Sequence, residues 1–431
     1  MHNIIVCLIV FFVLLFSGLP VAFVLGISSL SYFVVSGKLE MLAIIPSRLF
    51  EGMDSFVLMA IPLFILAGEF MNHGGIVQRL VSLADVLVGR LRGGLAYVNV
   101  LGSMFFGGIT GSALSDVAAL GSMLIPAMEK SGYDKEFSTA VTAAAAIQGP
   151  IIPPSIPAVL ISAATGTSVG ALFIAGAVPG VMVGLTCCVI VAILSGRRRY
   201  PRNQEHYTLA RFCRIVGAAL LPLFTPIIIL GGILFGIFTP TEAAAAAVFY
   251  ALLLTIVVLK SLSFEDVIKC LKTTVLSTCK IYLIIGFASV FAWVLAMENI
   301  PVLTASALFG VSHNVYVVLL LINLFVLFWG MWLDTAPAII ILMPLLFPIA
   351  QKLGINDIHF GCIMLVNLMI GQLTPPFGMT LFTAQAVSGV SLKGLLRELC
   401  PFLVADLVLL ALVTYVPAIS LFLPAQFGFG K

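Results

Sequence analysis

The sequence has little charge and lacks the signatures of several enzyme and pump classes. Only 9% of its 431 residues are charged, whereas 61% are apolar and the mean hydropathy is +1.20. It contains no CxxC pair, no nucleotide-binding P-loop and no HExxH metal signature. These absences argue against a soluble domain, an ATP-driven pump and an intramembrane metalloprotease. We therefore expect an all-α polytopic membrane protein that is not an enzyme.

The N-terminus also lacks the basic region that opens a signal peptide, and it continues into further apolar sequence. This pattern predicts a first membrane helix rather than a cleaved leader. Residues 3–35 are interrupted at Gly18-Leu19-Pro20, so they form either two short helices or one long kinked helix. The sequence leaves open whether this stretch crosses the membrane once or twice.

Paired prolines interrupt two segments that are otherwise apolar enough to cross a membrane. Residues 137–164 carry GPIIPPS at 149–155, and residues 358–388 carry GQLTPPFG at 371–378. Proline removes a backbone donor and disfavours helical geometry in the residue before it. We predict that both segments are broken transmembrane helices whose freed carbonyls and amides line a cavity.

Two other apolar segments have glycine and polar residues at their centres. Residues 94–130 contain FFGGITGS at 105–112, and residues 315–352 contain GMWLDT at 330–335. We predict that each forms a re-entrant helical hairpin whose tip lies inside the membrane.

The hairpins and broken helices recur at a nearly fixed offset. A shift of 222 or 223 positions places Gly107 on Gly330 and Pro153-Pro154 on Pro375-Pro376. This match predicts two internal repeats, at residues 56–195 and 281–400, each with a hairpin followed by a broken helix; the first also has an amphipathic arm helix. The rest of the chain would supply N-terminal scaffold helices (1–55), a basic cytoplasmic loop with linking scaffold helices and a basic segment (196–280), and the last transmembrane helix and tail (401–431).

Positive charge is unevenly distributed and predicts the orientation. If the basic loop at residues 197–214 is cytoplasmic and neither hairpin crosses, the basic residues left outside are Lys38, Arg48, Lys352 and Lys431. This asymmetry agrees with the positive-inside rule. It places the repeats in opposite orientations, with the first hairpin open to the cytoplasm and the second to the outside. Inverted repeats with broken helices indicate a secondary transporter, and no Lys or Arg falls at the predicted midplane.

Asp334 is the main candidate for a cation ligand. It lies at the second hairpin tip, where an ionised side chain costs at least about 2.5–3.5 kcal/mol unless it is paired. No Lys or Arg is near in sequence, so a bound Na⁺ is the predicted partner, with Thr335, Thr374 and the carbonyls around residues 375–378 as further oxygen ligands. The alternative, which is compatible with the first, is that Asp334 caps the second helix of the hairpin.

The first repeat has no carboxylate at the equivalent tip position. A cation site there would use Ser112 and the carbonyls around residues 149–153, while Asp116, one turn further on, is expected to be a hydrogen-bonded structural residue. Uncharged polar residues are predicted to line the substrate cavity; they are Ser103, Gln148, Ser155, Asn367 and Gln372. The alternative for each is an interhelical hydrogen bond. An anionic substrate would then depend on helix N-termini and bound cations.

The motifs FFGGITGS, WGMWLD, GPIIPPS and GQLTPPFG, together with residues 59–75, resemble the DctM-like large membrane subunit of TRAP (tripartite ATP-independent periplasmic) transporters. The resemblance covers essentially the whole chain. It implies a multi-pass protein of the bacterial inner membrane, an elevator mechanism and Na⁺ as the coupling ion, with no other cofactor. It also implies a small membrane subunit and a periplasmic substrate-binding protein as partners. The Na⁺ ligands that the motif match implies are Gly111, Ser112, Gly149, Ile152, Pro153, Asp334, Thr335, Thr374, Pro375 and Gly378.

The function predicted in this way is a Na⁺-coupled large permease subunit. It would import a small organic anion, such as a carboxylate, sugar acid or sialic acid, that a binding protein delivers. One alternative is a stand-alone cation-coupled anion carrier of related architecture that needs no binding protein. Another is a channel built on the same inverted repeat.

Overall fold

The computed structural model describes residues 2–202 and 208–429, and every regular element in these two ranges is a helix. Positions 203–207 of the predicted basic loop lie outside the described residues, as do positions 1, 430 and 431. Seven of the described helices are long and apolar enough to cross a membrane, or eight if one bent pair counts as a single span. The predicted all-α polytopic fold is therefore confirmed.

The first half of the chain contains the N-terminal helices, the arm, the first hairpin and the first broken helix. The N-terminal helices and the arm are α1 (His2–Phe16), α2 (Val21–Val35), α3 (Ile45–Met53), α4 (Ala60–His73) and α5 (Ile76–Val88). The hairpin and the broken helix are α6 (Gly94–Thr110), α7 (Ala113–Lys130), α8 (Lys135–Ala146) and α9 (Ile156–Thr165). Residues 3–35 thus form two helices, and α1 and α2 pack against each other.

Five helices connect this part to the second hairpin. They are α10 (Val169–Arg198), α11 (Leu209–Leu234), α12 (Pro240–Leu253), α13 (Phe264–Met297) and α14 (Ile300–Val311). A capping box starts α12: the Thr239 hydroxyl accepts a hydrogen bond from the Glu242 amide, and the Glu242 carboxylate accepts one from the Thr239 amide at 2.8 Å. Glu242 is therefore a capping residue, as its position in the sequence suggests.

The second hairpin and broken helix repeat the order of the first, and two more helices end the chain. They are α15 (Val315–Trp332), α16 (Thr335–Lys352), α17 (Asp357–Gly371), α18 (Met379–Ser388), α19 (Leu392–Tyr415) and α20 (Ala418–Gln426). Helix α19, which corresponds to the predicted last transmembrane helix, starts at Leu392 rather than at position 401, because Pro401 is accommodated inside it. It bends by 57° into α20.

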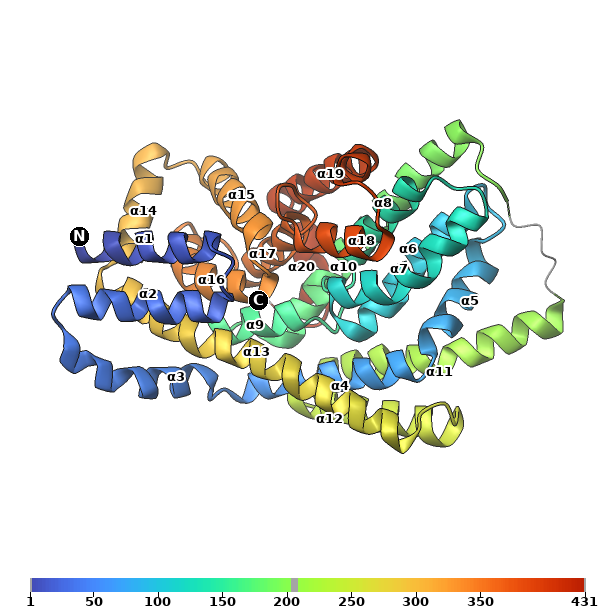
Figure 1. Cartoon of the computed structure of the whole chain (residues 1–431), viewed down its shortest axis with the longest axis horizontal. Coiled ribbons are helices and arrows are strands. Elements are labelled where there is room, and N and C mark those ends of the chain that lie inside the picture. Colours follow the sequence, from blue (N-terminus) through green and yellow to red (C-terminus); the bar gives the residue numbers. More distant parts are fainter. Residues whose placement is uncertain (1, 203–207, 430–431) are drawn as a thin grey trace.

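Helix α13 is the longest element, and it runs along α2, α3 and α4 in Figure 1. Its 34 residues include most of the predicted basic segment 260–280, from Phe264 to Lys280, which the sequence places apart from the following span. The predicted boundary at 280/281 therefore lies inside a continuous helix, because nothing between these residues breaks the hydrogen-bond ladder. We call α1–α4 and α11–α13 the scaffold, and the hairpins and broken helices with α10 and α19 the transport part.

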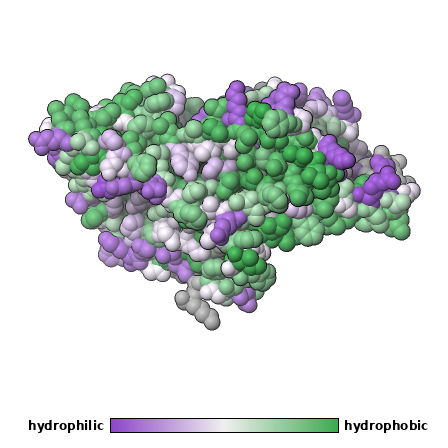
Figure 2. All heavy atoms as spheres, turned by 90° about the horizontal axis from the view of Figure 1, so that it is seen from below, coloured by the Kyte–Doolittle hydropathy of each residue, from purple (hydrophilic) through white to green (hydrophobic). Residues whose placement is uncertain are grey.

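Much of the molecular surface is apolar, as a lipid environment requires. Figure 2 shows hydrophobic residues over much of one face, with hydrophilic residues gathered toward its edges. Large exposed apolar side chains occur on several long helices, for example Leu185 on α10, Ile227 on α11 and Phe249 on α12. A soluble protein rarely exposes apolar surface on this scale, so these faces are the lipid-facing sides of the spans.

Candidate functional site

The second hairpin tip places a carboxylate at the start of α16. Asp334 is the N-cap of α16, and its Oδ1 accepts a hydrogen bond of 2.7 Å from the Thr335 amide. The same oxygen accepts a second bond of 2.7 Å from Gln372 Nε2, which also donates to Thr335 Oγ1 at 2.6 Å. Among the described residues, no hydrogen-bond donor contacts Oδ2 of Asp334. The tip thus combines the predicted cap with one carboxylate oxygen that is available to a ligand.

The second broken helix supplies Gln372 and the non-helical backbone beside it. Residues 372–378 connect α17 to α18, and the Pro375–Pro376 bond is cis. Thr374 Oγ1 donates to the Ile370 carbonyl at 2.9 Å, while Gly378 is the N-cap of α18. Thr380 Oγ1 donates to Gln372 Oε1 at 3.1 Å, which fixes the orientation of the amide that contacts Asp334.

The first hairpin tip has the same architecture with a hydroxyl in place of the carboxylate. Gly111 has a left-handed backbone (φ +61°), and Ser112 caps α7 by accepting a bond of 3.4 Å from the Ser115 amide. The connection between α8 and α9 contains a second cis bond, Pro153–Pro154, at the position equivalent to the one in the other repeat. Ser155 caps α9 and donates its hydroxyl hydrogen to the Pro150 carbonyl.

Each tip packs directly on the broken helix of its own repeat through a pair of glycines. A Cβ added to Gly107 would lie 2.2 Å from the Cα of Gly149, so the two backbones touch. In the second repeat a Cβ on Gly330 would lie 3.1 Å from the Cα of Gly371. Any side chain at these positions would push the hairpin tip away from the connection of the broken helix. This steric limit explains why glycine occupies these positions.

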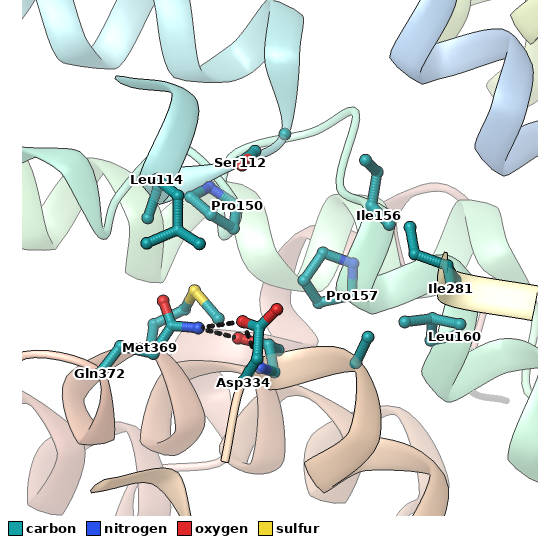
Figure 3. A pocket seen from close by; sticks show the side chains of 14 residues that line it. Ser112, Leu114, Pro150, Ile156, Pro157, Leu160, Ile281, Asp334, Met369 and Gln372 are labelled. Carbon is teal, nitrogen blue, oxygen red and sulfur yellow. Dashed lines mark hydrogen bonds between the residues drawn. The ribbon is translucent and has the colours of Figure 1, made fainter. Parts of the chain in front are cut away.

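A cavity of about 120 Å³ lies between the two tips. In Figure 3, Ser112, Leu114 and Pro150 of the first repeat face Asp334, Met369 and Gln372 of the second. The N-termini of α7, α9 and α16 all line this cavity, through Ala113, Ile156 and Thr335. Asp334 is the only acidic residue among the described residues that line it. The cavity therefore combines one carboxylate with three helix ends that carry partial positive charge.

The predicted cation residues divide into two positions. Gly111, Ser112, Asp334 and Thr335 line the small cavity. The others lie in the connections of the broken helices; they are Gly149, Ile152, Pro153, Thr374, Pro375 and Gly378. Whether an ion binds between tip and connection stays a prediction.

Of the predicted substrate residues, only Gln372 lines this cavity. Gln148 is fully buried and donates to the Val100 carbonyl at 2.8 Å, and Asn367 is fully buried and donates to Asn323 Oδ1 at 2.7 Å. Both contacts favour the alternative of an interhelical hydrogen bond. Ser103 is fully buried inside the transport part, and Ser155 is engaged in the cap of α9.

A larger cavity of about 450 Å³ continues from the tips toward the scaffold. It shares Ser112 and Asp334 with the small cavity, and α4 and α13 contribute Glu69, Asn72, Ser277 and Lys280. Lys280 therefore borders a cavity that reaches both tips, although the sequence predicts no Lys or Arg at the midplane. By sequence alone, the basic residues before Lys280 place it in a cytoplasmic segment. The apolar run that starts directly after it, at Ile281, indicates instead that Lys280 borders a membrane span.

The hydrogen bonding predicted for Asp116 is not found among the described residues. Asp116 is fully buried in α7, and neither carboxylate oxygen makes a hydrogen bond of normal geometry among the described residues. The hydroxyl of Ser103 on α6 is likewise buried without a hydrogen-bond partner among the described residues. Asp406 in α19, also in the transport part, is buried and has no hydrogen-bond partner among the residues that the structure describes. Buried carboxylates without hydrogen bonds are costly when ionised, so hydrogen bonding does not account for Asp116.

These features define a class of protein. Two hairpins and two broken helices that meet around a cavity inside an apolar helical fold are typical of secondary transporters. Such sites use half-helix N-termini and unwound backbone to bind ions and polar groups at membrane depth.

Comparisons with known proteins identify the family. A family model described as "Tripartite ATP-independent periplasmic transporter, DctM component" matches residues 8–419. The chain is 39% identical over 423 residues to the sialic acid TRAP transporter large permease protein SiaM of Vibrio cholerae, covering 97% of this chain and 98% of that protein. It is 40% identical over 401 residues to the C4-dicarboxylate TRAP transporter large permease protein DctM of Pseudomonas aeruginosa, covering 91% and 94%. The chain belongs to the family of DctM components of TRAP transporters.

A solved structure supports the fold independently. The YdaH transporter of Alcanivorax borkumensis matches with a TM-score of 0.60 at 16% identity, covering 91% of this chain and 90% of that one. Family membership confirms the predicted location in the bacterial inner membrane and the predicted transport role. It also confirms the predicted partners at the level of the family, since a small membrane subunit and a periplasmic substrate-binding protein complete the tripartite system.

Proposed function

We propose that this chain is the large permease subunit of a Na⁺-coupled transporter, not an enzyme, and that it imports a small organic anion by an elevator mechanism. The observation that carries the proposal is the cavity between the tips, where Asp334 faces Ser112 and three helix N-termini converge. A carboxylate suits a hard monovalent cation, and helix N-termini suit an anion. The site thus offers complementary groups to both an ion and its co-transported substrate.

Na⁺ is the coupling ion in this proposal, and no other cofactor is involved. The second site would use Asp334, Thr335 and Thr374 with backbone carbonyls near Pro375 and Gly378. The first would use Ser112 and backbone carbonyls near Gly111, Gly149, Ile152 and Pro153. Bound cations would neutralise Asp334, so an anion could enter a cavity that otherwise carries negative charge.

The substrate class follows from the relatives and from the site together. The named relatives transport sialic acid and C4-dicarboxylates, both of which are carboxylates. The helix N-termini that line the cavity would bind a carboxylate group without a basic residue from the transport part. Movement of the transport part against the scaffold would carry ion and substrate together.

Uptake is expected to require both Na⁺ and the binding protein. Proteoliposomes that contain the chain and its small subunit would be given labelled N-acetylneuraminate or succinate, with and without an inward Na⁺ gradient. Accumulation should occur only when the gradient and the periplasmic binding protein are both present. A K⁺ gradient of the same size is the control.

Other results would favour the other candidates. Accumulation without any binding protein would indicate the stand-alone carrier. Flux that does not saturate and never exceeds the external concentration would indicate a channel. Transport that is independent of Na⁺ but driven by a proton gradient would overturn only the proposal that Na⁺ is the coupling ion.

A further inference from the structure

We propose that Lys280 forms an anion subsite on the scaffold and holds the carboxylate of the substrate while the tips lie at the level seen in this structure. The inference rests on the proposed function, because it assumes an anionic substrate. It adds a residue of the scaffold to a site that the hairpins and broken helices otherwise form.

Lys280 lies in the middle of α13, at the junction between the charged first half of this helix and the apolar run that starts at Ile281. It stands 16 residues after Phe264 and 17 before Met297, the two ends of α13. At a rise of 1.5 Å per residue, it is about 25 Å from either end. A lysine at the edge of an apolar run faces water, a polar cavity or a partner of opposite charge, and the side chain of Lys280 is exposed.

The cavity supplies that environment. Lys280 lines the 450 Å³ cavity together with Ser112 and Asp334, so its wall is continuous with the two hairpin tips. Ser277, one turn earlier on α13, lines the same space. Among the described residues, Lys280 is the only basic residue on the wall of either cavity that contains Asp334.

No acid in the described ranges, 2–202 and 208–429, pairs with this lysine. Glu69 lines the same wall, but its Oε2 lies 3.5 Å from His73 Nδ1, one turn further along α4. No ion pair of Lys280 occurs within the described part of the chain, although Asp334 and Glu69 border the same cavity. A positive charge that the fold leaves unpaired on the wall of a cavity is a binding group for an anion.

The position of Lys280 also makes its effect dependent on the transport cycle. It belongs to α13, which packs along α2, α3 and α4, whereas Asp334 and Ser112 belong to the hairpins. When the transport part moves against the scaffold, the tips move and Lys280 does not. Lys280 therefore contacts the substrate only in the state seen here, in which the cavity runs from the tips along α4 and α13.

Direct binding measurements test this subsite. The chain, purified with its small subunit in NaCl, would be titrated calorimetrically with N-acetylneuraminate and with succinate. Lys280→Gln should weaken the binding of the transported acid by about tenfold or more, the size expected for losing a hydrogen bond to a charged group. Lys280→Arg should retain most of the affinity. Lys272→Gln is the matched control, because Lys272 is an exposed lysine of the same helix that lines neither cavity.

A charge-neutral analogue separates recognition from a structural effect. The amide or methyl ester of the same acid should bind more weakly than the acid to the wild-type protein. In Lys280→Gln this preference for the acid should be smaller, because the ammonium group that interacts with the charged carboxylate is absent. The Na⁺-dependent rise in the unfolding midpoint should be unchanged in this variant, since Lys280 is not proposed to bind Na⁺.

Each outcome decides between the claims. If wild type binds and transports an acid while Lys280→Gln binds it equally well, the subsite is overturned and the proposed function stands. If Lys280→Gln loses affinity equally for the acid and for its neutral analogue, Lys280 maintains the shape of the cavity and does not recognise the charge of the substrate. The proposed anion subsite is then overturned. If wild type neither binds nor transports an anion, the proposed function fails and the subsite fails with it.

Discussion

Replacing Asp334 by asparagine is expected to remove most of the stabilisation that Na⁺ gives to the folded protein. A ligand that binds only the folded state stabilises it by about 2.7 kcal/mol at a hundred times its Kd. Asparagine keeps the size of the side chain and can still accept the bond from the Thr335 amide, which is 2.7 Å long in the wild type. The substitution therefore removes the charge that attracts the cation and keeps the helix cap.

The measurement is thermal unfolding of the purified protein and its small subunit against NaCl, with KCl and choline chloride at matched ionic strength. Wild type should show a rise in midpoint that is specific to Na⁺, and Asp334→Asn or Asp334→Ala should blunt it. Asp54→Asn is the control, because Asp54 is exposed and lines neither cavity between the tips and the scaffold. An equal rise with all three salts, or an undiminished Na⁺ response in the variants, would remove Asp334 from the ion site.

An alanine at position 107 is expected to destabilise the protein, although alanine normally favours a helix. The added Cβ would lie 2.2 Å from the Cα of Gly149, a backbone atom that cannot rotate away. Overpacking of this kind costs about 1–3 kcal/mol. Because the contact joins the first tip to its broken helix, the variant should also weaken any Na⁺ response that depends on this pair.

Gly217→Ala provides the matched comparison for the Gly107 variant. Gly217 also lies inside a helix, α11, and a Cβ there would meet no atom within 4 Å. Alanine at such a position stabilises a helix by up to about 1 kcal/mol relative to glycine. The two unfolding midpoints should therefore move in opposite directions. If the Gly107→Ala protein is as stable as the Gly217→Ala protein, the first hairpin tip is not tightly packed against the connection between α8 and α9.

Local rules of chain geometry explain what the sequence could predict. The paired prolines at 153–154 and 375–376 interrupt helices for reasons that involve only their neighbours. The breaks after Ala146 and Gly371 could therefore be expected from the sequence alone. Asp334 could be singled out for a similar reason, because an acid in an apolar run needs a partner wherever the run folds.

Contacts between distant segments explain what the sequence could not predict. Gln148 and Asn367 are polar residues in apolar spans, and composition does not say whether such a residue faces a cavity or another helix. The structure places Asn367 against Asn323 on α15, 44 positions away. Lys280 was missed because basic residues before it suggest a solvated segment, whereas the fold continues one helix through them.

The glycine contacts have a further consequence for how such a chain could arise. Gly107 and Gly149 belong to the same half of the sequence, and so do Gly330 and Gly371. The glycine contact of each tip is therefore made within one half of the sequence, even though α7 also packs against α18 and α16 against α9. A polypeptide of half this length would already hold both partners of one such glycine contact. Duplication of a half-length gene would therefore carry this contact into both copies, and packing between the copies would be added to it.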